Sequence, residues 1–199
     1  MNRILTLVLA VGFSAGWTCA QTIRKGDCVV DSEVWTLPAC ALETQNGRLY
    51  VSKVYLPLFF TSTGKATQTG APRNLAWAQM SGGGWAYFNR AGLIVVQDIA
   101  TMDNGPSEFH HGLVRIVKAG KWGLSTPQGT LIVPPKYDGM LDYQEGTGWL
   151  VCSGCHVGPE KGSEYSFFTG GKWAWLDRHG KVSGTASDPS LARGEKAKN

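Results

Sequence analysis

The sequence predicts an all-β fold of stacked antiparallel β-hairpin repeats behind an N-terminal β cap, and three observations predict it. Glycine supplies 26 of the 199 residues, and a glycine inside a helix costs about 1 kcal/mol relative to alanine. Charged residues make up 17% and hydrophobic residues 43% of the chain, which is not the composition of a disordered protein. Three segments align without gaps from a tryptophan to a glycine seven residues later, a pattern that favours short strands joined by glycine turns.

Residues 1–20 are predicted to be a secretory signal peptide. Arg3 supplies a positive charge, an apolar run follows over Ile4–Phe13, and small residues precede a cleavage point after Ala20. The run is too short to cross a bilayer, which takes about 20 residues, and a lipoprotein signal ending at Cys19 is the less favoured alternative. We therefore expect a periplasmic or secreted protein with no stable membrane insertion after cleavage.

Residues 21–73 are predicted to form the N-terminal cap. Four cysteines remain after cleavage, and an even number in an exported chain favours disulfides. Local pairing joins Cys28 to Cys40, closing a loop that is worth about 3 kcal/mol in the loop-entropy model. Residues 47–60 alternate well enough for one or two strands, with Pro57 at an edge or turn.

The motif Cys152-Ser153-Gly154-Cys155-His156 has three interpretations. A local disulfide between Cys152 and Cys155 is favoured, because the flanking sequence predicts a strand and a Gly/Pro loop. The motif also matches the C-x-x-C-H signature of c-type haem attachment, in which both thiols bond to the haem and the histidine binds its iron. A metal site formed by these residues with His110 or His111 is the third interpretation.

Residues 74–184 contain the three repeat units. The segments that align from tryptophan to glycine are Trp85–Gly92, Trp122–Gly129 and Trp173–Gly180. A short apolar segment precedes each of them, namely Leu75–Met80, Leu113–Val117 and Trp149–Cys152. Each unit should therefore be three antiparallel strands, which can bury their apolar faces only by stacking on a neighbouring unit. The residues expected to form the repeat core are Trp85, Trp122, Trp173, Gly92, Gly129 and Gly180.

These units resemble the WG-repeat (KWG) family. The second unit matches best, with Gly120-Lys121-Trp122-Gly123-Leu124 followed by the run Ile132–Asp138. The first and third units depart from the pattern, because Ala86 and Ala174 replace the glycine after the tryptophan. The resemblance covers about residues 74–184. It implies an all-β repeat module, common in secreted or envelope proteins of bacteria, and no shared catalytic residue.

No catalytic motif of the G-x-S-x-G, H-E-x-x-H or Walker A type occurs in the sequence. The pair His110-His111 beside Glu108 falls in a polar turn of the repeat, and residues 185–199 are expected to be a flexible tail. A net charge of +4 does not by itself indicate nucleic-acid binding.

We therefore expect a non-enzymatic binding protein without a cofactor, whose partner is a protein or another envelope component. Its size and compartment would fit an immunity protein against a toxin that acts in the periplasm. The alternative is a c-type haem protein that uses Cys152, Cys155 and His156 for electron transfer or sensing.

Overall fold

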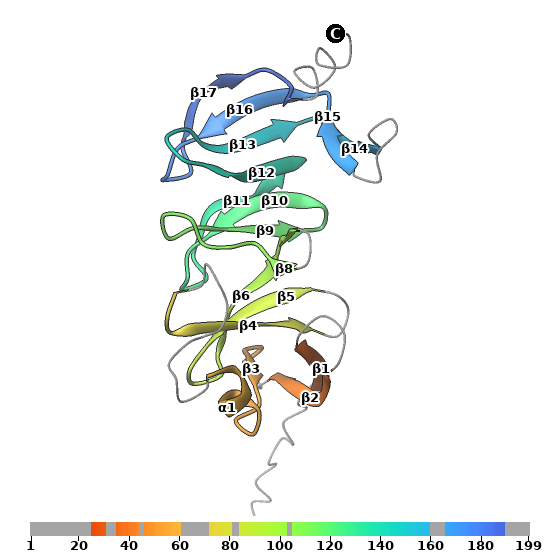
Figure 1. The fold of residues 1–199 in the computed structure, drawn as a ribbon, viewed down its shortest axis with the longest axis vertical. Helices are drawn as coiled ribbons and strands as arrows, with labels where there is room; N and C mark the ends of the chain where they lie inside the picture. The colour runs from red at the N-terminus through yellow and green to blue at the C-terminus, as the bar shows by residue number, and fades with distance from the viewer. Residues whose placement is uncertain are drawn as a thin grey trace, which may run out of the picture.

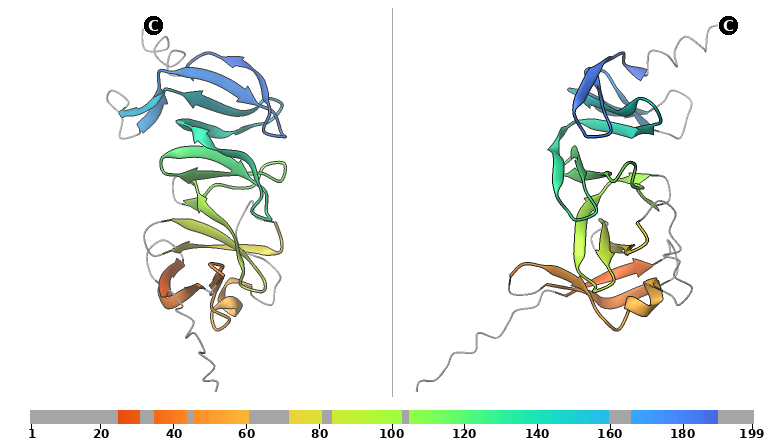
Figure 2. Two further views of the ribbon diagram at one scale, coloured as in Figure 1. Left: turned by 180° about the vertical axis from the view of Figure 1, so that it is seen from behind. Right: turned by 90° about the vertical axis from the view of Figure 1, so that its left-hand side faces the viewer.

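The computed structural model describes residues 25–30, 35–43, 46–60, 72–80, 84–102, 105–159 and 166–189. The predicted signal peptide and most of the predicted tail lie outside these residues. The described chain is predominantly antiparallel β-structure, which confirms the predicted class (Figure 1). It rises along one long axis from the first strands at one end to the last strands at the other (Figures 1 and 2). None of the described helices has the length and apolar character needed to span a bilayer.

Four three-stranded antiparallel meanders make up most of the structure. Meander 1 contains β1 (Lys25–Val30), β2 (Trp35–Glu43) and β3 (Leu49–Val51). Meander 2 contains β4 (Leu75–Met80), β5 (Trp85–Asn89) and β6 (Ile94–Ile99). Meander 3 contains β9 (Val114–Lys118), β10 (Lys121–Ser125) and β11 (Leu131–Tyr137). Meander 4 contains β13 (Gly148–Ser153), β16 (Lys172–Leu176) and β17 (Val182–Ala186), so strand structure extends into the start of the predicted tail.

Meanders 2, 3 and 4 share one register between their second and third strands. The residue two positions after the tryptophan pairs with the residue eleven positions after it, in the pairs Tyr87–Val96, Leu124–Val133 and Trp175–Gly184. The residue three positions after the tryptophan pairs with the residue nine positions after it, in the pairs Phe88–Ile94, Ser125–Leu131 and Leu176–Val182. Each ladder has its register shift in this region, so the same bulged hairpin occurs three times.

The turns of these three hairpins are also equivalent. A side-chain oxygen four positions after the tryptophan accepts hydrogen bonds from two backbone N–H groups of the turn. The acceptors are Asn89 Oδ1 (from Ala91 and Leu93), Thr126 Oγ1 (from Gln128 and Thr130) and Asp177 Oδ1 (from His179 and Lys181). The turn glycine that follows has a positive φ of 84°, 82° or 75° at Gly92, Gly129 and Gly180. Asn, Thr and Asp suit this position because each carries a short side-chain acceptor.

The turn of meander 4 is expected to be the acid-sensitive one. The backbone N–H of Lys181, followed by that of His179, holds the pKa of Asp177 below its ordinary value. A depressed folded-state pKa stabilises the protein above the unfolded pKa, and this stability is lost as pH falls through the folded-state value. Asp177→Asn keeps the acceptor and should flatten the decline in unfolding midpoint between pH 6 and pH 2. Asn89→Asp, its counterpart in meander 2, should steepen that decline, and equal acid profiles for all three proteins would contradict the assignment.

Each turn glycine lies against the third strand of the preceding meander. A Cβ atom added to Gly92 or Gly129 would collide with the carbonyl oxygen of Val51 or Val95, respectively. One added to Gly180 would meet the Val133 side chain at 2.7 Å. The turns at Gly92 and Gly129 are therefore in direct contact with the backbone of the preceding meander, whereas Gly180 lies against side chains of meander 3.

Meander 1 follows a similar plan, with a cysteine in place of the tryptophan, but its second hairpin has no bulge, because Leu42 pairs with Tyr50 in a regular ladder. Gly47, seven positions after Cys40, has a φ of 69°. The pair Glu43–Leu49 has the register of Phe88–Ile94 in meander 2. The segment that the sequence sets apart as a cap is thus a fourth meander.

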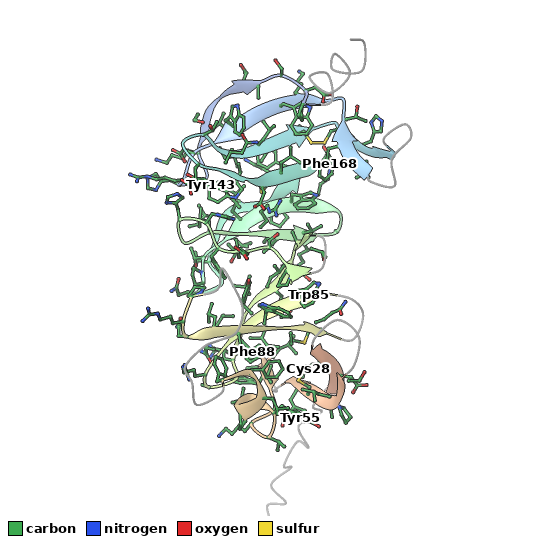
Figure 3. All side chains as sticks on the ribbon, in the orientation of Figure 1. Cys28, Tyr55, Trp85, Phe88, Tyr143 and Phe168 are labelled. Atoms are coloured by element: carbon green, nitrogen blue, oxygen red, sulfur yellow. A yellow bond between two sulfur atoms is a disulfide. The ribbon has the colours of Figure 1, made fainter. Side chains whose placement is uncertain are left out.

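Meanders 1, 2 and 3 merge into one nine-stranded sheet with the order β11-β10-β9-β6-β5-β4-β1-β2-β3. This sheet curls, so that β3 at its edge returns to the β5–β6 turn. The N–H of Val51 on β3 donates to the carbonyl of Gly92 in that turn at 2.7 Å. The curl encloses a core that includes Cys28, Phe59 and Phe88, two of which are labelled in Figure 3. Meander 4 joins β12 (Gly139–Gln144) in a separate four-stranded sheet.

One expectation about local structure needs correction. The segment 47–60 has the short strand β3 and then the helix α1 (Leu56–Phe59), because Pro57 lies in the first turn of the helix, where its missing N–H costs nothing. Meander 4 contains an inserted hairpin between its first and second strands, formed by β14 (His156–Pro159) and β15 (Ser166–Thr169). Trp122 and Trp173 are therefore further apart in the sequence than Trp85 and Trp122. One further short pair is formed by β7 (Thr101–Met102) and β8 (Gly105–Pro106).

Candidate functional site

The cysteines of the first hairpin lie at disulfide distance, in the pairing that the sequence favours. Cys28 on β1 and Cys40 on β2 have Cα atoms 5.4 Å apart, and both side chains are fully buried. They pack in the core that also contains Phe59 and Phe88. The bridge therefore joins the two strands from within the curled sheet.

The CSGCH motif spans the end of β13 and the start of the inserted hairpin. Cys152 and Cys155 lie at disulfide distance with Cα atoms 5.9 Å apart, and Cys152 is fully buried beside Trp173. His156 is exposed at the first position of β14. Two such cysteine pairs indicate an oxidising compartment outside the cytoplasm.

The loop between these cysteines is tied to meander 3. Asp138 Oδ2 accepts a hydrogen bond from the Gly154 N–H at 2.7 Å, and the Asp138 carboxylate also pairs with Lys121 on β10. The hydrogen bond from Lys121, followed by that from Gly154, lowers the pKa of Asp138. The loop is held in place by a carboxylate that stays ionised at neutral pH.

The arrangement of this motif differs from that required for haem or metal attachment. Thioether bonds need two free sulfurs that reach the edge of a haem, whereas Cys152 is enclosed in the core and faces Cys155. Within the described part of the chain, no three His, Cys, Asp or Glu side chains are grouped to hold a metal ion. The local disulfide is the interpretation that the geometry favours.

The three repeat tryptophans do not share one environment. Trp85 and Trp173 are buried, as expected of core residues. Trp122 is only half-buried, and its ring makes a T-shaped contact with Phe168 of the inserted hairpin, with ring centres 5.6 Å apart. The guanidinium of Arg115 is 6.0 Å from the centre of the same ring.

The strongest candidate for a binding site lies where meander 3 meets β12. It consists of His110, His111, Arg115, Asp142, Tyr143 and Glu145, which we call the His110 cluster. In Figure 3, Tyr143 marks it on the side of the molecule away from Phe168.

A tight turn presents the two histidines of the cluster. The N–H and carbonyl groups of His110 and Leu113 bond to each other at 2.8 and 2.9 Å. Between them, His111 and Gly112 both have positive φ, 48° and 76°. These positive φ values are those of a type I′ hairpin turn, and both imidazoles contact Tyr143.

Carboxylates from β12 and its following turn face these imidazoles. His110 Nε2 is 3.5 Å from Asp142 Oδ1, and His111 Nε2 is 3.7 Å from Glu145 Oε2. Glu108, which the sequence places beside the histidines, acts instead on Tyr87, whose pKa is raised first by burial and then by the Glu108 charge. The carboxylates that face the histidines thus come from more than thirty positions further along the chain.

Arg115 on β9 contacts the cluster from its buried side. Its side chain is 2% exposed, yet its Nη2 atom lies 3.3 Å from the half-exposed carboxylate of Asp142. Its Nη1 atom donates to the carbonyl of Met140 at 3.3 Å, whereas Nε and Nη2 make no hydrogen bond within the described residues, so the contact with Asp142 is an ion pair only. Burial lowers the pKa of Arg115 and the Asp142 charge partly restores it. A buried cation therefore fixes the position of an accessible carboxylate.

Tyr143 connects this polar group to the hydrophobic core. Its ring stacks on His110 at 5.4 Å and contacts His111 at 4.8 Å, while its other neighbour is the buried Trp149 at 4.7 Å. The cluster combines a fixed carboxylate and a partly exposed tyrosine on β12 with two imidazoles in a tight turn. Such a group can make directional contacts with a partner at little entropic cost.

Two cavities flank the bulge of β6, where Asp98 has a φ of 57°. One measures 280 Å³ and includes Ile116, Lys118 and Leu131, and the other measures 290 Å³ and includes Met80 and Trp85. Gln97 and Asp98 line both.

Comparisons with family models, curated proteins and solved structures find no match to this chain. The candidate site thus rests on its own geometry. The sequence singles out the two histidines of the cluster but neither Arg115 nor Tyr143. Arg115 could have been noticed in the sequence as a charged residue inside the apolar segment Leu113–Val117.

Proposed function

We propose that this chain is a non-catalytic interaction protein of the bacterial envelope, built on WG-type repeats, and that the His110 cluster contacts a protein partner. The repeated register and equivalent turns of meanders 2, 3 and 4 support a stiff scaffold. The observation that carries the proposal is the cluster itself, in which buried Arg115 and Trp149 hold Asp142 and Tyr143 at the surface. An immunity-type role against a periplasmic toxin is one form that such binding would take.

Affinity capture with matched variants tests this proposal. The tagged mature protein would be incubated with a periplasmic extract of its source bacterium, and captured proteins would be quantified by mass spectrometry. His111→Ala/Glu145→Ala alters only exposed side chains, and Tyr143→Ala removes the central ring. Truncation of residues at a binding hot spot costs about 2 kcal/mol, so capture of a specific partner should fall at least tenfold.

His156→Ala is the control, because it removes an exposed histidine from a different hairpin. It should capture the same partner at the wild-type level. A partner retained equally by the wild type and both cluster variants would contradict the assignment of the site, and the absence of any saturable partner would contradict the proposed function.

The c-type haem protein remains the second candidate, and only the CSGCH motif favours it. The protein would be produced in a host with active haem-attachment machinery and its absorbance recorded after denaturation. We expect no retained Soret band, because Cys152 and Cys155 are paired. A covalently retained band that disappears in His156→Ala would establish haem binding instead.

A further inference from the structure

The end of the molecule formed by α1 carries two exposed aliphatic side chains, one of which, Val54, is the most exposed large hydrophobic side chain of the described residues. Val54 and Leu58 are 78% and 59% exposed. They lie on either side of Tyr55, Leu56 and Pro57, at the end of the long axis opposite meander 4 (Figure 1).

The inner side of the same segment is held firmly. Phe59 is buried and meets the edge of Phe88 at 4.8 Å, and Phe60 meets the same ring at 5.8 Å. The Tyr55 hydroxyl donates to the Pro38 carbonyl at 3.0 Å. These contacts fix the backbone, so Val54 and Leu58 are presented outward rather than folded into the core.

Basic residues surround this apolar tip. The described segments 46–60, 72–74 and 89–93 contain Arg48, Lys53, Arg73 and Arg90 and no acidic residue. The Arg90 guanidinium lies 5.0 Å from the Phe60 ring centre, and the pair Leu75–Asn89 brings the Arg73 turn beside the Arg90 turn. Asp27, on β1, has its carboxylate engaged by the Ala39 N–H at 2.8 Å.

We propose that this tip, which we call the α1 tip (Val54, Leu58, Lys53 and Arg90), docks peripherally on an anionic lipid surface. Aliphatic side chains enter the boundary between headgroups and acyl chains, while neighbouring Lys and Arg remain among anionic headgroups. A soluble phosphate ligand would leave Val54 and Leu58 in water, so a lipid bilayer matches both parts of the tip. Such docking is consistent with the absence of stable insertion expected from the sequence.

Vesicle co-sedimentation of the full mature chain tests the proposal. We expect binding to vesicles of phosphatidylcholine mixed with phosphatidylglycerol, and little binding to phosphatidylcholine alone. Val54→Asp/Leu58→Asp should reduce the apparent affinity at least tenfold. Both side chains are exposed, so the variant should keep the wild-type circular dichroism spectrum and unfolding midpoint.

Val157→Asp/Val182→Asp provides a matched control, because these valines are 61% and 63% exposed but lie in the inserted hairpin and in meander 4. It adds the same charge and should bind vesicles like the wild type. An equal loss of vesicle affinity in the two double variants would show that only net charge matters, and would overturn the proposal. Failure of the wild type to bind anionic vesicles would overturn it as well. Binding of the tip to a protein and not to vesicles would also overturn it. His111→Ala/Glu145→Ala should bind vesicles normally, which separates this test from that of the His110 cluster.

Discussion

Replacing Gly129 with alanine is expected to lower the free energy of unfolding by about 3 kcal/mol or more. The φ of 82° alone should cost about 1–2 kcal/mol for a residue with a Cβ atom. The new Cβ would also collide with the carbonyl oxygen of Val95. That oxygen belongs to β6 of the preceding meander, so relief of the clash requires two packed meanders to separate. Urea unfolding followed by tryptophan fluorescence would measure the loss.

Gly120→Ala is the control for this prediction. Gly120 has a similar φ of 72°, but a Cβ atom there has no neighbour within 4 Å. It should cost only the backbone term, about 1–2 kcal/mol. Equal losses in the two variants would show that the turn of meander 3 does not rest on β6.

The sequence was sufficient to predict the local hairpins because their signals are local. Trp85, Trp122 and Trp173 each begin or follow the start of a strand, and the glycine seven positions later takes a positive φ. A side-chain acceptor between them completes each turn. Meander 1 escaped detection because Cys40 stands in the tryptophan position, although Gly47 keeps the positive φ.

The way the meanders combine was less predictable. Stacked units were expected, whereas meanders 1, 2 and 3 share a continuous sheet through the pairs Cys28–Met80 and Ile99–Ile116. These pairs join residues far apart in the sequence, and no turn chemistry encodes them. Their partners are selected by which apolar faces can be buried together, a property of the whole chain.

The His110 cluster illustrates the same limit. The motif His110-His111 was visible, but its partners lie on β12, a strand that sequence reasoning did not predict. Asp142 lies within β12 and reaches buried Arg115. A polar cluster assembled between two sheets leaves no spacing pattern in the sequence, so only the fold reveals it.

Reduction of the Cys28–Cys40 bridge is expected to cost about 3 kcal/mol, more than reduction of Cys152–Cys155. The first pair is separated by 12 residues and the second by 3. Loop entropy scales with the logarithm of loop length, which gives about 3 and about 2 kcal/mol, respectively. Because all four side chains are buried or nearly so, alanine variants would add cavity costs. Comparing oxidised with reduced protein in each alanine background avoids them.

In the Cys152→Ala/Cys155→Ala background, dithiothreitol would open only the Cys28–Cys40 bridge, and the converse background would isolate the other.

Thiol titration of the denatured, oxidised wild type should find no free thiol, and two or more would contradict the pairing. Cys40 occupies the position that a tryptophan fills in the other meanders, so the bridge stands where those meanders have an aromatic side chain. Reduction should therefore release the amides of β1 and β2 to hydrogen exchange before those of β9 and β10. Uniform exchange across the sheet would instead show that the nine strands open as one cooperative unit, with the bridge stabilising all of them equally.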